Sequence, residues 1–369
     1  MLYLGLMSGT SLDGVDGVVA RFDAGRPCVL GHLHQPFDTV LRRELLALNT
    51  PGEDEIHRCA LAANAVSRAY AGVVDGLIRA CDLDLRDIRA LGAHGQTVRH
   101  RPHQFDGTGY TVQLLNGALL AELTGTDVVC DLRSRDLAAG GQGAPLVPAF
   151  HAALFGRPGE AGAVLNLGGI ANLTLLGQDG DDVRGFDCGP GNALMDAWCE
   201  RHTGRSYDDD GRWAAAGRVD QTLLARLLAE PYFAQQPPKS TGRDLFHTGW
   251  LDAVLQTCGR QAEPVDVQAT LAELTARAAT EALVRHSHGA RQLLVCGGGA
   301  FNGHLMRRLS ALAPGVEVLS TGAKGVPADQ VEALAFAWLA RQFIDRRPGN
   351  LPSVTGARGT RVLGALHPA

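Results

Sequence analysis

Positive charge in this chain comes almost entirely from arginine, because only two lysines, Lys239 and Lys324, occur among its 369 residues. The sequence contains no GxxxxGK[ST] pattern, which excludes a Walker A phosphate loop. The formal net charge is −5, so the chain lacks the basic excess that indicates nucleic-acid binding. Any phosphate clamp must therefore use backbone N–H groups, arginine or a metal ion.

Other absences narrow the class of protein further. The eight cysteines include no CxxC pair, which predicts reduced thiols rather than a zinc site or a disulfide framework. No apolar run reaches the roughly 18 residues that a membrane span needs. The start, Met1-Leu2-Tyr3, lacks the charged segment of a signal peptide. We therefore expect a cytoplasmic protein with no nucleic-acid or membrane partner.

The chain does contain an unusual turn between two apolar runs, LGLMSGTSLDGVD at residues 4–16. Such a turn exposes backbone N–H groups and hydroxyls with little side-chain bulk, which suits phosphate oxygens. Its carboxylates suit Mg²⁺ beside those phosphates, and we assign the metal to Asp13. The alternative is an ordinary glycine-containing hairpin. The residues expected to contact the phosphates are Gly9, Thr10, Ser11, Leu12, Asp13, Gly14, Val15 and Asp16.

Two later segments repeat this chemistry. Residues 163–176 form a second apolar–turn–apolar pattern, and residues 293–302 run from an apolar strand through three glycines into a helix. A glycine run at a helix entry lets a nucleotide lie against the backbone. The expected nucleotide contacts in these two segments are Gly168, Gly169, Asn172, Gly298, Gly299 and Asn302.

Two phosphate hairpins in two halves indicate an internal duplication. The pattern resembles the superfamily of sugar kinases, heat-shock chaperone ATPases and actin. This resemblance implies an α/β fold with two duplicated ribonuclease-H-like (actin-like ATPase) domains around a central cleft that binds ATP. A glycine-rich loop after residues 128–130 marks the boundary, giving an N-terminal domain over 1–127 and a C-terminal domain over 128–369. The segment 345–369 is expected to be a tail or to return to the first domain.

Apolar periodicity predicts the principal elements of both halves. Strands are expected at 2–7, 15–22, 29–35, 88–93, 110–115, 128–130, 293–296 and 316–319, with a strand-rich stretch at 163–187. Helices are expected at 37–49, 54–81, 117–124, 146–155, 192–203, 219–229, 248–257, 267–286, 301–312 and 328–343.

Two carboxylates are candidates for catalysis. Asp187 follows an apolar strand and precedes a loop that enters a helix, FDCGPGN at 186–192. A carboxylate at the C-terminal end of a strand faces the crevice where ligands bind in open α/β sheets. This predicts a general base, and the alternative is an Asx turn. Glu332 opens the last long helix, where the alternative is an exposed first-turn glutamate favoured by the helix dipole.

Five polar residues after two strands are candidates for substrate binding. Arg133 and Asp136 follow residues 128–130, and an arginine there suits a carboxylate of the substrate, although a surface salt bridge is the alternative. His94, Gln96 and Thr97 follow residues 88–93 and suit sugar hydroxyls or an N-acetyl group. His94 is equally consistent with a satisfied core histidine.

Six segments closely resemble the anhydro-N-acetylmuramic acid kinase family, and the resemblance runs from end to end. They are MSGTSLDG at 7–14, AHGQTVRH at 93–100, AAGGQGAPLVPAFH at 138–151, NLGGIANLT at 166–174, FDCGPGNALMDAW at 186–198 and VEALAFAWLA at 331–340. The resemblance implies an enzyme of cell-wall (peptidoglycan) recycling that opens 1,6-anhydro-N-acetylmuramic acid with water. The released O6 is phosphorylated from ATP, giving N-acetylmuramic acid 6-phosphate and ADP.

The same resemblance implies roles for particular residues. Asp187 would activate the water, Glu332 would help to hold it, and Arg133 would read the lactyl carboxylate of the sugar. A homodimer is also implied, with the helices at 248–257 and 267–286 as a possible face. The chain departs from the family where it has Cys188 in place of the more usual Thr, and a thiol is a weaker hydrogen-bond partner than a hydroxyl.

Other readings differ in substrate or in chemistry. A kinase for another 1,6-anhydrosugar such as levoglucosan would keep Asp187 and both hairpins, and would differ around Arg133 and Asp136. A catalytically silent sugar- or ATP-binding sensor would have no use for Asp13, Asp187 and Glu332. An actin-like polymer would need contact insertions that the sequence does not show.

Overall fold

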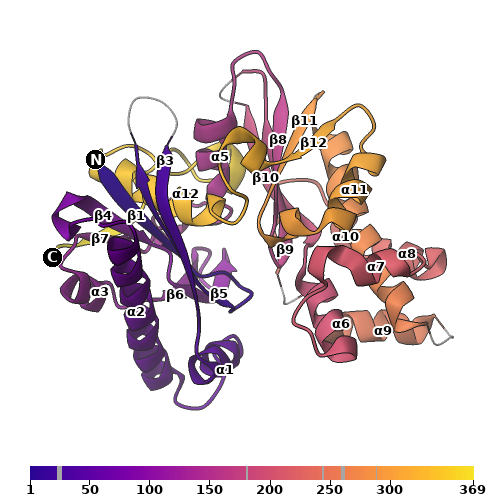
Figure 1. Ribbon diagram of the computed structural model, residues 1–369, viewed down its shortest axis with the longest axis horizontal. Helices are drawn as coiled ribbons and strands as arrows, with labels where there is room; N and C mark the ends of the chain where they lie inside the picture. The colour runs from indigo at the N-terminus through magenta and orange to yellow at the C-terminus, as the bar shows by residue number, and fades with distance from the viewer. Residues whose placement is uncertain (23–26, 180–181, 243–244, 259–261, 288) are drawn as a thin grey trace. The chain divides into compact units, whose positions relative to one another are not determined.

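The computed structural model describes residues 1–369 except 23–26, 180–181, 243–244, 259–261 and 288 (Figure 1). The chain divides into two compact units. Unit 1 consists of Met1–Leu154 and Gln330–Ala369, and unit 2 consists of Phe155–Asp329. Two units, each with its own core, agree with the aliphatic composition of the chain.

Unit 1 is built on a sheet in the order β13-β7-β4-β1-β2-β3. The strands are β1 (Leu2–Met7), β2 (Gly14–Arg21), β3 (Cys28–Pro36), β4 (Ile88–Ala93), β7 (Val128–Cys130) and β13 (Ala365–His367). Strand β2 runs antiparallel to both β1 and β3. Strand β4 pairs in parallel with β1 on one side and with β7 on the other. A separate hairpin pairs β5 (Gln96–Pro102) with β6 (Gly109–Leu114).

Helices cover both faces of the unit 1 sheet (Figure 1). A Cβ added to Gly17 of β2 would meet Val73 of α2, whereas one added to Gly5 of β1 would overlap the carbonyl oxygen of Ala333 in α12. Gly17 pairs with the residue after Gly5, so the two glycines face opposite sides. The helices are α1 (Thr39–Ala47), α2 (Glu55–Ala80), α3 (Gly117–Thr124), α4 (Ser134–Ala138), α5 (Val147–Phe155), α12 (Val331–Ile344) and α13 (Pro352–Thr355), with the 3₁₀ turn η1 (Leu85–Asp87).

Unit 2 repeats the strand plan of unit 1. Its sheet has the order β10-β9-β8-β11-β12, with β8, β9 and β10 antiparallel and β11 parallel to β8 and β12. The strands are β8 (Gly162–Leu167), β9 (Ile170–Leu176), β10 (Val183–Pro190), β11 (Gln292–Cys296) and β12 (Glu317–Ser320). An antiparallel meander followed by two parallel strands thus occurs in both units, as the duplication predicts. The expected strand-rich stretch 163–187 contains residues 180–181, which lie outside the described residues.

One long helix forms much of the core of unit 2. The apolar residues of α10 (Pro264–His286) are buried from Val267 to Leu283, so this helix packs within its own unit. The other elements are α6 (Ala193–Thr203), η2 (Asp209–Gly211), α7 (Arg212–Ala216), α8 (Gln221–Leu228), η3 (Pro231–Ala234), α9 (Thr248–Thr257), η4 (Gly298–Phe301), α11 (Gly303–Leu312) and η5 (Thr321–Lys324). Within the described part of the chain, none of the helices combines the length and hydropathy that a membrane-spanning segment requires.

The boundaries of the two units fall between residues 154 and 155 and again between residues 329 and 330. The sequence predicted a boundary between residues 127 and 128. Residues 128–154 stay with unit 1 because β7 pairs with β4 and β13. The chain returns to unit 1 at Gln330, earlier than the expected return at 345, because α12 packs on β1 and β4. The C-terminal segment adds an antiparallel strand, β13, beside β7 of unit 1.

Candidate active site

The turn between β1 and β2 leaves backbone open at its first glycine. Among the described residues, a Cβ on Gly9 would meet nothing nearer than Ser11 Oγ at 3.6 Å, so this backbone is open to a close approach. Leu12 N donates to Gly9 O at 3.3 Å and Leu12 adopts a left-handed φ of 58°, while its side chain is buried. The buried Leu12 side chain anchors the turn, and only its backbone is available to a ligand.

The other residues of this turn divide into exposed and structural ones. Thr10 and Asp13 are exposed, and Ser11 Oγ donates to Asp13 Oδ1 at 2.8 Å. Val15 is buried in the core, and a Cβ on Gly14 would overlap the backbone of β3. The polar tip over residues 9–13 is therefore the part that suits phosphate and Mg²⁺.

Asp16 has partners on the neighbouring strand. Its Oδ1 lies 3.2 Å from His32 Nε2 and 3.0 Å from His34 Nδ1, and both histidines are on β3. The structure thus gives Asp16 two imidazole neighbours that the turn sequence did not indicate. These contacts stabilise the pairing of β2 with β3 and do not involve the turn over residues 9–13.

His94 connects the β1–β2 hairpin to Arg133. Its Nδ1 donates to Ser8 O at 3.2 Å, and its Nε2 accepts from Arg133 Nη2 at 2.8 Å. Burial, aided by the Arg133 charge, lowers the pKa of His94 to about 3, so the imidazole is neutral and can accept. Arg133 Nη1 also donates to Gly143 O at 2.8 Å. Because His94 is 5% exposed, it orients the guanidinium of Arg133 from within the protein.

Gln96 and Thr97 begin β5, beside the same hairpin. Gln96 Nε2 donates to Gly9 O at 3.0 Å and its residue is fully buried. Thr97 is half-buried and its Oγ1 accepts from Gln113 Nε2 at 3.2 Å. Gln96 therefore supports the β1–β2 turn directly, whereas Thr97 is half-buried.

Asp136 is enclosed by the C-terminal segment of unit 1. Its carboxylate is fully buried and accepts from Gly143 N at 2.8 Å, Asn350 Nδ2 at 2.6 Å and Thr355 Oγ1 at 2.8 Å. These bonds fix the glycine-rich loop that also receives Arg133. Asp136 therefore stabilises this loop. The sequence instead led us to expect Asp136 in direct contact with the substrate, and its complete burial does not fit that expectation.

Glu332 lies in the first turn of α12 and is half-buried. It belongs to unit 1, whereas Asp187 belongs to unit 2. A carboxylate in the first turn of a helix is stabilised as an anion by the helix dipole.

In unit 2, the turn between β8 and β9 is tied to the start of α6. Gly191 N and Asn192 N donate to Gly169 O and Gly168 O at 2.9 and 2.8 Å. The outer side of Gly168 is open, because a Cβ there would meet only Ile170 O at 3.8 Å. The carbonyls of Gly168 and Gly169 therefore accept hydrogen bonds within the protein, and the open side of the half-buried Gly168 is available to a ligand.

The three-glycine run forms the second part of this surface. A Cβ on Gly298 would meet only Asn192 Nδ2 at 3.8 Å, whereas one on Gly299 would press on Leu167 Cβ at 2.6 Å. Asn302 Oδ1 accepts from Leu305 N at 2.9 Å and caps α11. Gly298 is thus the position in the run that a ligand could approach. Gly299 is required for packing against Leu167, and Asn302 caps the N-terminus of α11.

Asp187 lies within the second half of β10 rather than after the strand, as the sequence predicted, and both of its carboxylate oxygens accept hydrogen bonds. Asn172 Nδ2 donates to Oδ1 at 2.9 Å, and the backbone N–H of Thr241 donates to Oδ2 at 2.9 Å. A β-bulge between Asp187 and Gly189 interrupts the pairing with β9 at this point and re-aims the chain. Asn172, expected to bind nucleotide, therefore contacts the candidate base.

The segment around residues 232–241 is the part of the site that sequence reasoning missed. Tyr232 OH donates to Asp187 O at 2.8 Å, and Asp187 N donates to Lys239 O at 3.2 Å. With Thr241, three residues of this segment hold the backbone and side chain of Asp187. The rarity of lysine was the available signal, because Lys239 is one of two in the chain.

Cys188 points away from this arrangement. Its side chain is 1% exposed and packs in the core of unit 2, and burial raises the pKa of its thiol. The orientation of the Asp187 carboxylate comes instead from Asn172 and Thr241.

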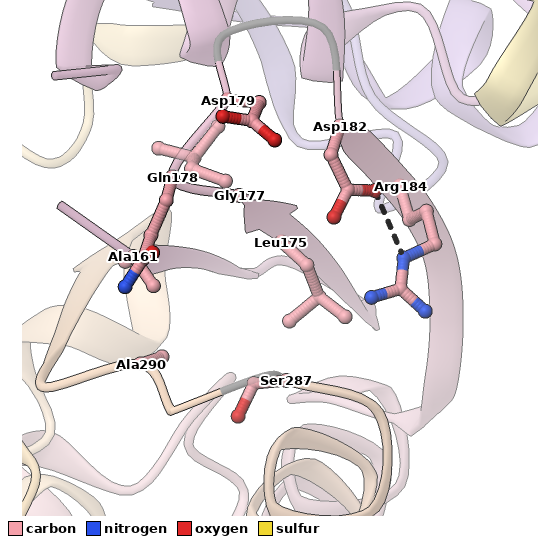
Figure 2. A pocket seen from close by; sticks show the side chains of 11 residues that line it. Ala161, Leu175, Gly177, Gln178, Asp179, Asp182, Arg184, Ser287 and Ala290 are labelled. Atoms are coloured by element: carbon pink, nitrogen blue, oxygen red, sulfur yellow. Dashed lines mark ion pairs between the residues drawn. The ribbon is translucent and has the colours of Figure 1, made fainter. Parts of the chain in front are cut away.

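A pocket at the other end of the unit 2 sheet has different chemistry. Figure 2 shows it beside the end of β9 and the start of β10, where Arg184 Nε lies 3.6 Å from Asp182 Oδ1. Asp187 is near the opposite end of β10. The pocket in Figure 2 is therefore separate from the candidate base.

The residues present fit a metal ion that is held mainly by phosphates. Among the residues with described positions, no three His, Cys, Asp or Glu side chains gather as a metal site. Mg²⁺ typically uses one or two carboxylates together with substrate phosphates and water. The exposed Asp13 beside the open backbone of Gly9 suits that arrangement.

Repeated sheets with polar turns at the β1–β2 and β8–β9 hairpins define the class of actin-like ATPases and sugar kinases with two ribonuclease-H-like domains. In fold, the chain is similar to component A of the (R)-2-hydroxyglutaryl-CoA dehydratase from Acidaminococcus fermentans, with a TM-score of 0.51 and 12% identity, over 91% of this chain and 96% of that chain. It is also similar to the activator of the 2-hydroxyisocaproyl-CoA dehydratase from Clostridium difficile, with a TM-score of 0.50 and 13% identity, over 94% and 96% of the two chains.

Sequence comparison identifies the family within this class. The model of the family described as anhydro-N-acetylmuramic acid kinase matches residues 1–369, and the chain belongs to this family. Proteins named anhydro-N-acetylmuramic acid kinase from Albidiferax ferrireducens and Variovorax paradoxus are 59% and 60% identical to it, over 100% of this chain and 99% of each relative.

Proposed function

We propose that this protein converts 1,6-anhydro-N-acetylmuramic acid, water and ATP into N-acetylmuramic acid 6-phosphate and ADP. Family membership over the whole chain supports the reaction. The observation that carries the chemistry is the carboxylate of Asp187, whose two oxygens are oriented by Asn172 and Thr241. Such fixed hydrogen bonds hold a base in one geometry for proton transfer.

The reaction balances with a single base. Asp187 takes a proton from water while the water oxygen attacks C1 of the sugar, as the carboxylate base does in inverting glycosidases. The C1–O6 bond breaks and its electron pair goes to O6. O6 then attacks the γ-phosphorus of ATP, and ADP leaves. Glu332 is proposed to hold the same water, and trapping of O6 by the phosphoryl group removes the need for a separate acid.

The backbone of the two hairpins is proposed to bind the phosphates of ATP. Open space above Gly9, Gly168 and Gly298 supports this assignment, because phosphate oxygens need close approach to N–H groups. Mg²⁺, held by Asp13 and the phosphates, would neutralise negative charge during phosphoryl transfer. Gln96 contributes by fixing the carbonyl of Gly9.

Arg133 is proposed to bind the lactyl carboxylate of the sugar. Its guanidinium is oriented by the neutral His94 and by Gly143 O, and a planar guanidinium suits a carboxylate. Thr97 is proposed to contact sugar hydroxyls. Asp136 is proposed to act indirectly, by holding the loop that receives Arg133.

The test is ADP release from the purified full chain with ATP, Mg²⁺ and 1,6-anhydro-N-acetylmuramic acid, beside levoglucosan and an Asp187→Asn variant. We expect turnover of the muramic sugar alone, loss of activity in Asp187→Asn by about 10³-fold or more, and oxygen from labelled water at C1. Faster turnover of levoglucosan would overturn the substrate assignment. ATP binding without turnover of either sugar would favour the silent sensor.

We further propose that the protein acts in the cytoplasm, in peptidoglycan recycling, and as a homodimer. The use of ATP and of a cell-wall sugar supports the first two. The buried apolar residues of α10 are not available as a dimer face, whereas α9, of which only Leu251 is buried, stays the proposed face. Light scattering of the purified chain tests the dimer, and a mass of one chain at micromolar concentration would overturn it.

A further inference from the structure

A second cavity in unit 2 is lined in part by Cys188, the residue next to the candidate base. It has a volume of about 210 Å³ and is formed between β10, the segment from α8 to Lys239, and the C-terminal half of α10. Its inner wall includes the apolar side chains of Cys188, Leu228 and Phe233. Cys188 is the residue next to Asp187, and its side chain is buried in the core of unit 2.

Lys239 brings a buried positive charge to this cavity. The residue is 8% exposed, and within the described ranges its Nζ donates to a single acceptor, Tyr232 O at 3.1 Å, with no carboxylate at ion-pair distance. Nζ also lies 4.6 Å from the centre of the Tyr232 ring. An ammonium has three N–H donors, and burial of a charge is costly unless it is paired. Burial lowers the pKa of Lys239, which agrees with incomplete compensation.

Two further basic side chains line the same cavity. Arg285 lies at the exposed rim, where its Nη1 donates to Phe233 O at 3.4 Å, and no ion pair to Arg285 exists among the described residues. His286 packs edge-on against Phe186. Glu281, which is exposed, is the single acidic residue among the described ones around the cavity. Positive charge therefore exceeds negative charge in a small, partly apolar hollow.

We propose that this cavity is a binding site for a small phosphate-type oxyanion, held between Lys239 and Arg285. A lysine supplies a point charge and an arginine a planar fork of donors, and together they suit the several oxygens of a phosphate. The volume admits inorganic phosphate or a small phosphate monoester. The site lies on the α10 side of β10 and is distinct from the nucleotide hairpins.

The cavity shares a segment of chain with the candidate base. Tyr232, which accepts from Lys239 Nζ, donates its hydroxyl to Asp187 O, and the carbonyl of Lys239 accepts from Asp187 N. An anion bound to Lys239 Nζ therefore also restricts the motion of residues 232–241, which hydrogen-bond to Asp187. This effect on turnover rests on the proposed function, whereas binding of the anion does not.

The test is a titration of the full chain with inorganic phosphate, in which broadening of the ³¹P NMR line measures binding. We expect Arg285→Ala to weaken binding at least fivefold and Lys239→Met at least tenfold. Arg226→Ala is the matched control, since Arg226 is an exposed arginine on α8 without a described ion pair, and it should bind as the wild type does. Equal binding by the wild type, Arg285→Ala and Arg226→Ala would overturn the site, even if Lys239→Met fails to fold.

A parallel titration with methyl phosphate distinguishes the source of the anion. Tighter binding of the ester indicates a phosphate monoester, and tighter binding of the free ion indicates inorganic phosphate. Either result supports the site if it depends on Arg285. In the kinase assay, phosphate should change kcat in the wild type and not in Arg285→Ala. Arg285-dependent binding in a protein without kinase activity would retain the site and reject the proposed function.

Discussion

Asp187 owes its orientation to donors that come from two different parts of unit 2. Asn172 is on β9, one strand away, whereas Thr241 lies 54 residues further along the chain. A carboxylate fixed by two donors loses little entropy when it accepts a proton from a bound water, which favours catalysis by positioning. At this scale the proposed site is therefore a candidate base together with the groups that orient its carboxylate.

Removal of the Asn172 donor should lower turnover rather than nucleotide affinity. A hydrogen bond to a charged group contributes about 1.5–3 kcal/mol, so Asn172→Ala should lower kcat by about 10- to 100-fold. Asn172→Asp should lower it further, because a second carboxylate would face Asp187. Steady-state kinetics with varied ATP measures both effects. A raised KM for ATP with unchanged kcat would contradict this role and return Asn172 to nucleotide binding.

Single residues show where prediction from sequence stops. Asp187 could be found because its strand and glycine-rich loop are local signals. Its partner Thr241 could not, because no local pattern reports a contact over 54 positions. His94 has the same limitation, since its neutral state depends on burial and on Arg133 from another strand end. The sequence thus reveals chemically distinctive side chains better than the groups that position them.

At the scale of elements, apolar periodicity predicted most strands and helices correctly. Strand β1 and helix α3 have the expected bounds, whereas β5 was missed. β5 belongs to a two-stranded hairpin with an arginine- and histidine-rich sequence, so it lacks clear apolar alternation. The short β13 is also missing from the prediction, because three residues are too few to carry a pattern.

The C-terminal segment should stabilise the loop that receives Arg133. Thr355 Oγ1 donates to the fully buried Asp136, and Thr355→Val removes this donor with little change in volume. We expect a loss of about 2 kcal/mol in the free energy of unfolding and a higher KM for the sugar. Urea denaturation measures the loss. Thr360→Val, at an exposed position, is the control, and equal stability of the two variants would contradict the role of Thr355.

The contact between α12 and β1 depends on a glycine. A Cβ on Gly5 would overlap the backbone oxygen of Ala333, so Gly5→Ala must displace α12, which carries Glu332. We expect a cost of about 3 kcal/mol, at the upper end for an overpacked core. Gly162→Ala is the matched strand control, because its Cβ would meet only Gln292 O at 3.9 Å. Similar unfolding midpoints in urea for both variants would refute this packing argument.

For the whole molecule, duplication places one half of the predicted chemistry in each unit. Unit 1 contains the first phosphate hairpin, Arg133 and Glu332, and unit 2 contains Asp187 and the glycine run. Each unit must therefore be folded for activity, although each has its own hydrophobic core. The sequence predicted this duplication from its two polar turns, but the shared strand order of the units could be seen only in the sheets themselves.

Stability of the whole chain should fall in mild acid. Burial lowers the pKa of both His94 and His151 to about 3, whereas histidine in the unfolded chain titrates near 6.5. Between these values the unfolded state binds more protons, so the free energy of unfolding decreases as the pH falls below about 6.5. The two residues together should cost about 3 kcal/mol at about pH 5.5 relative to about pH 7.5. Urea denaturation at the two pH values measures this difference, and His151→Gln should reduce it by about half. An unfolding free energy that is the same at both pH values would contradict a folded state in which these two histidines stay neutral.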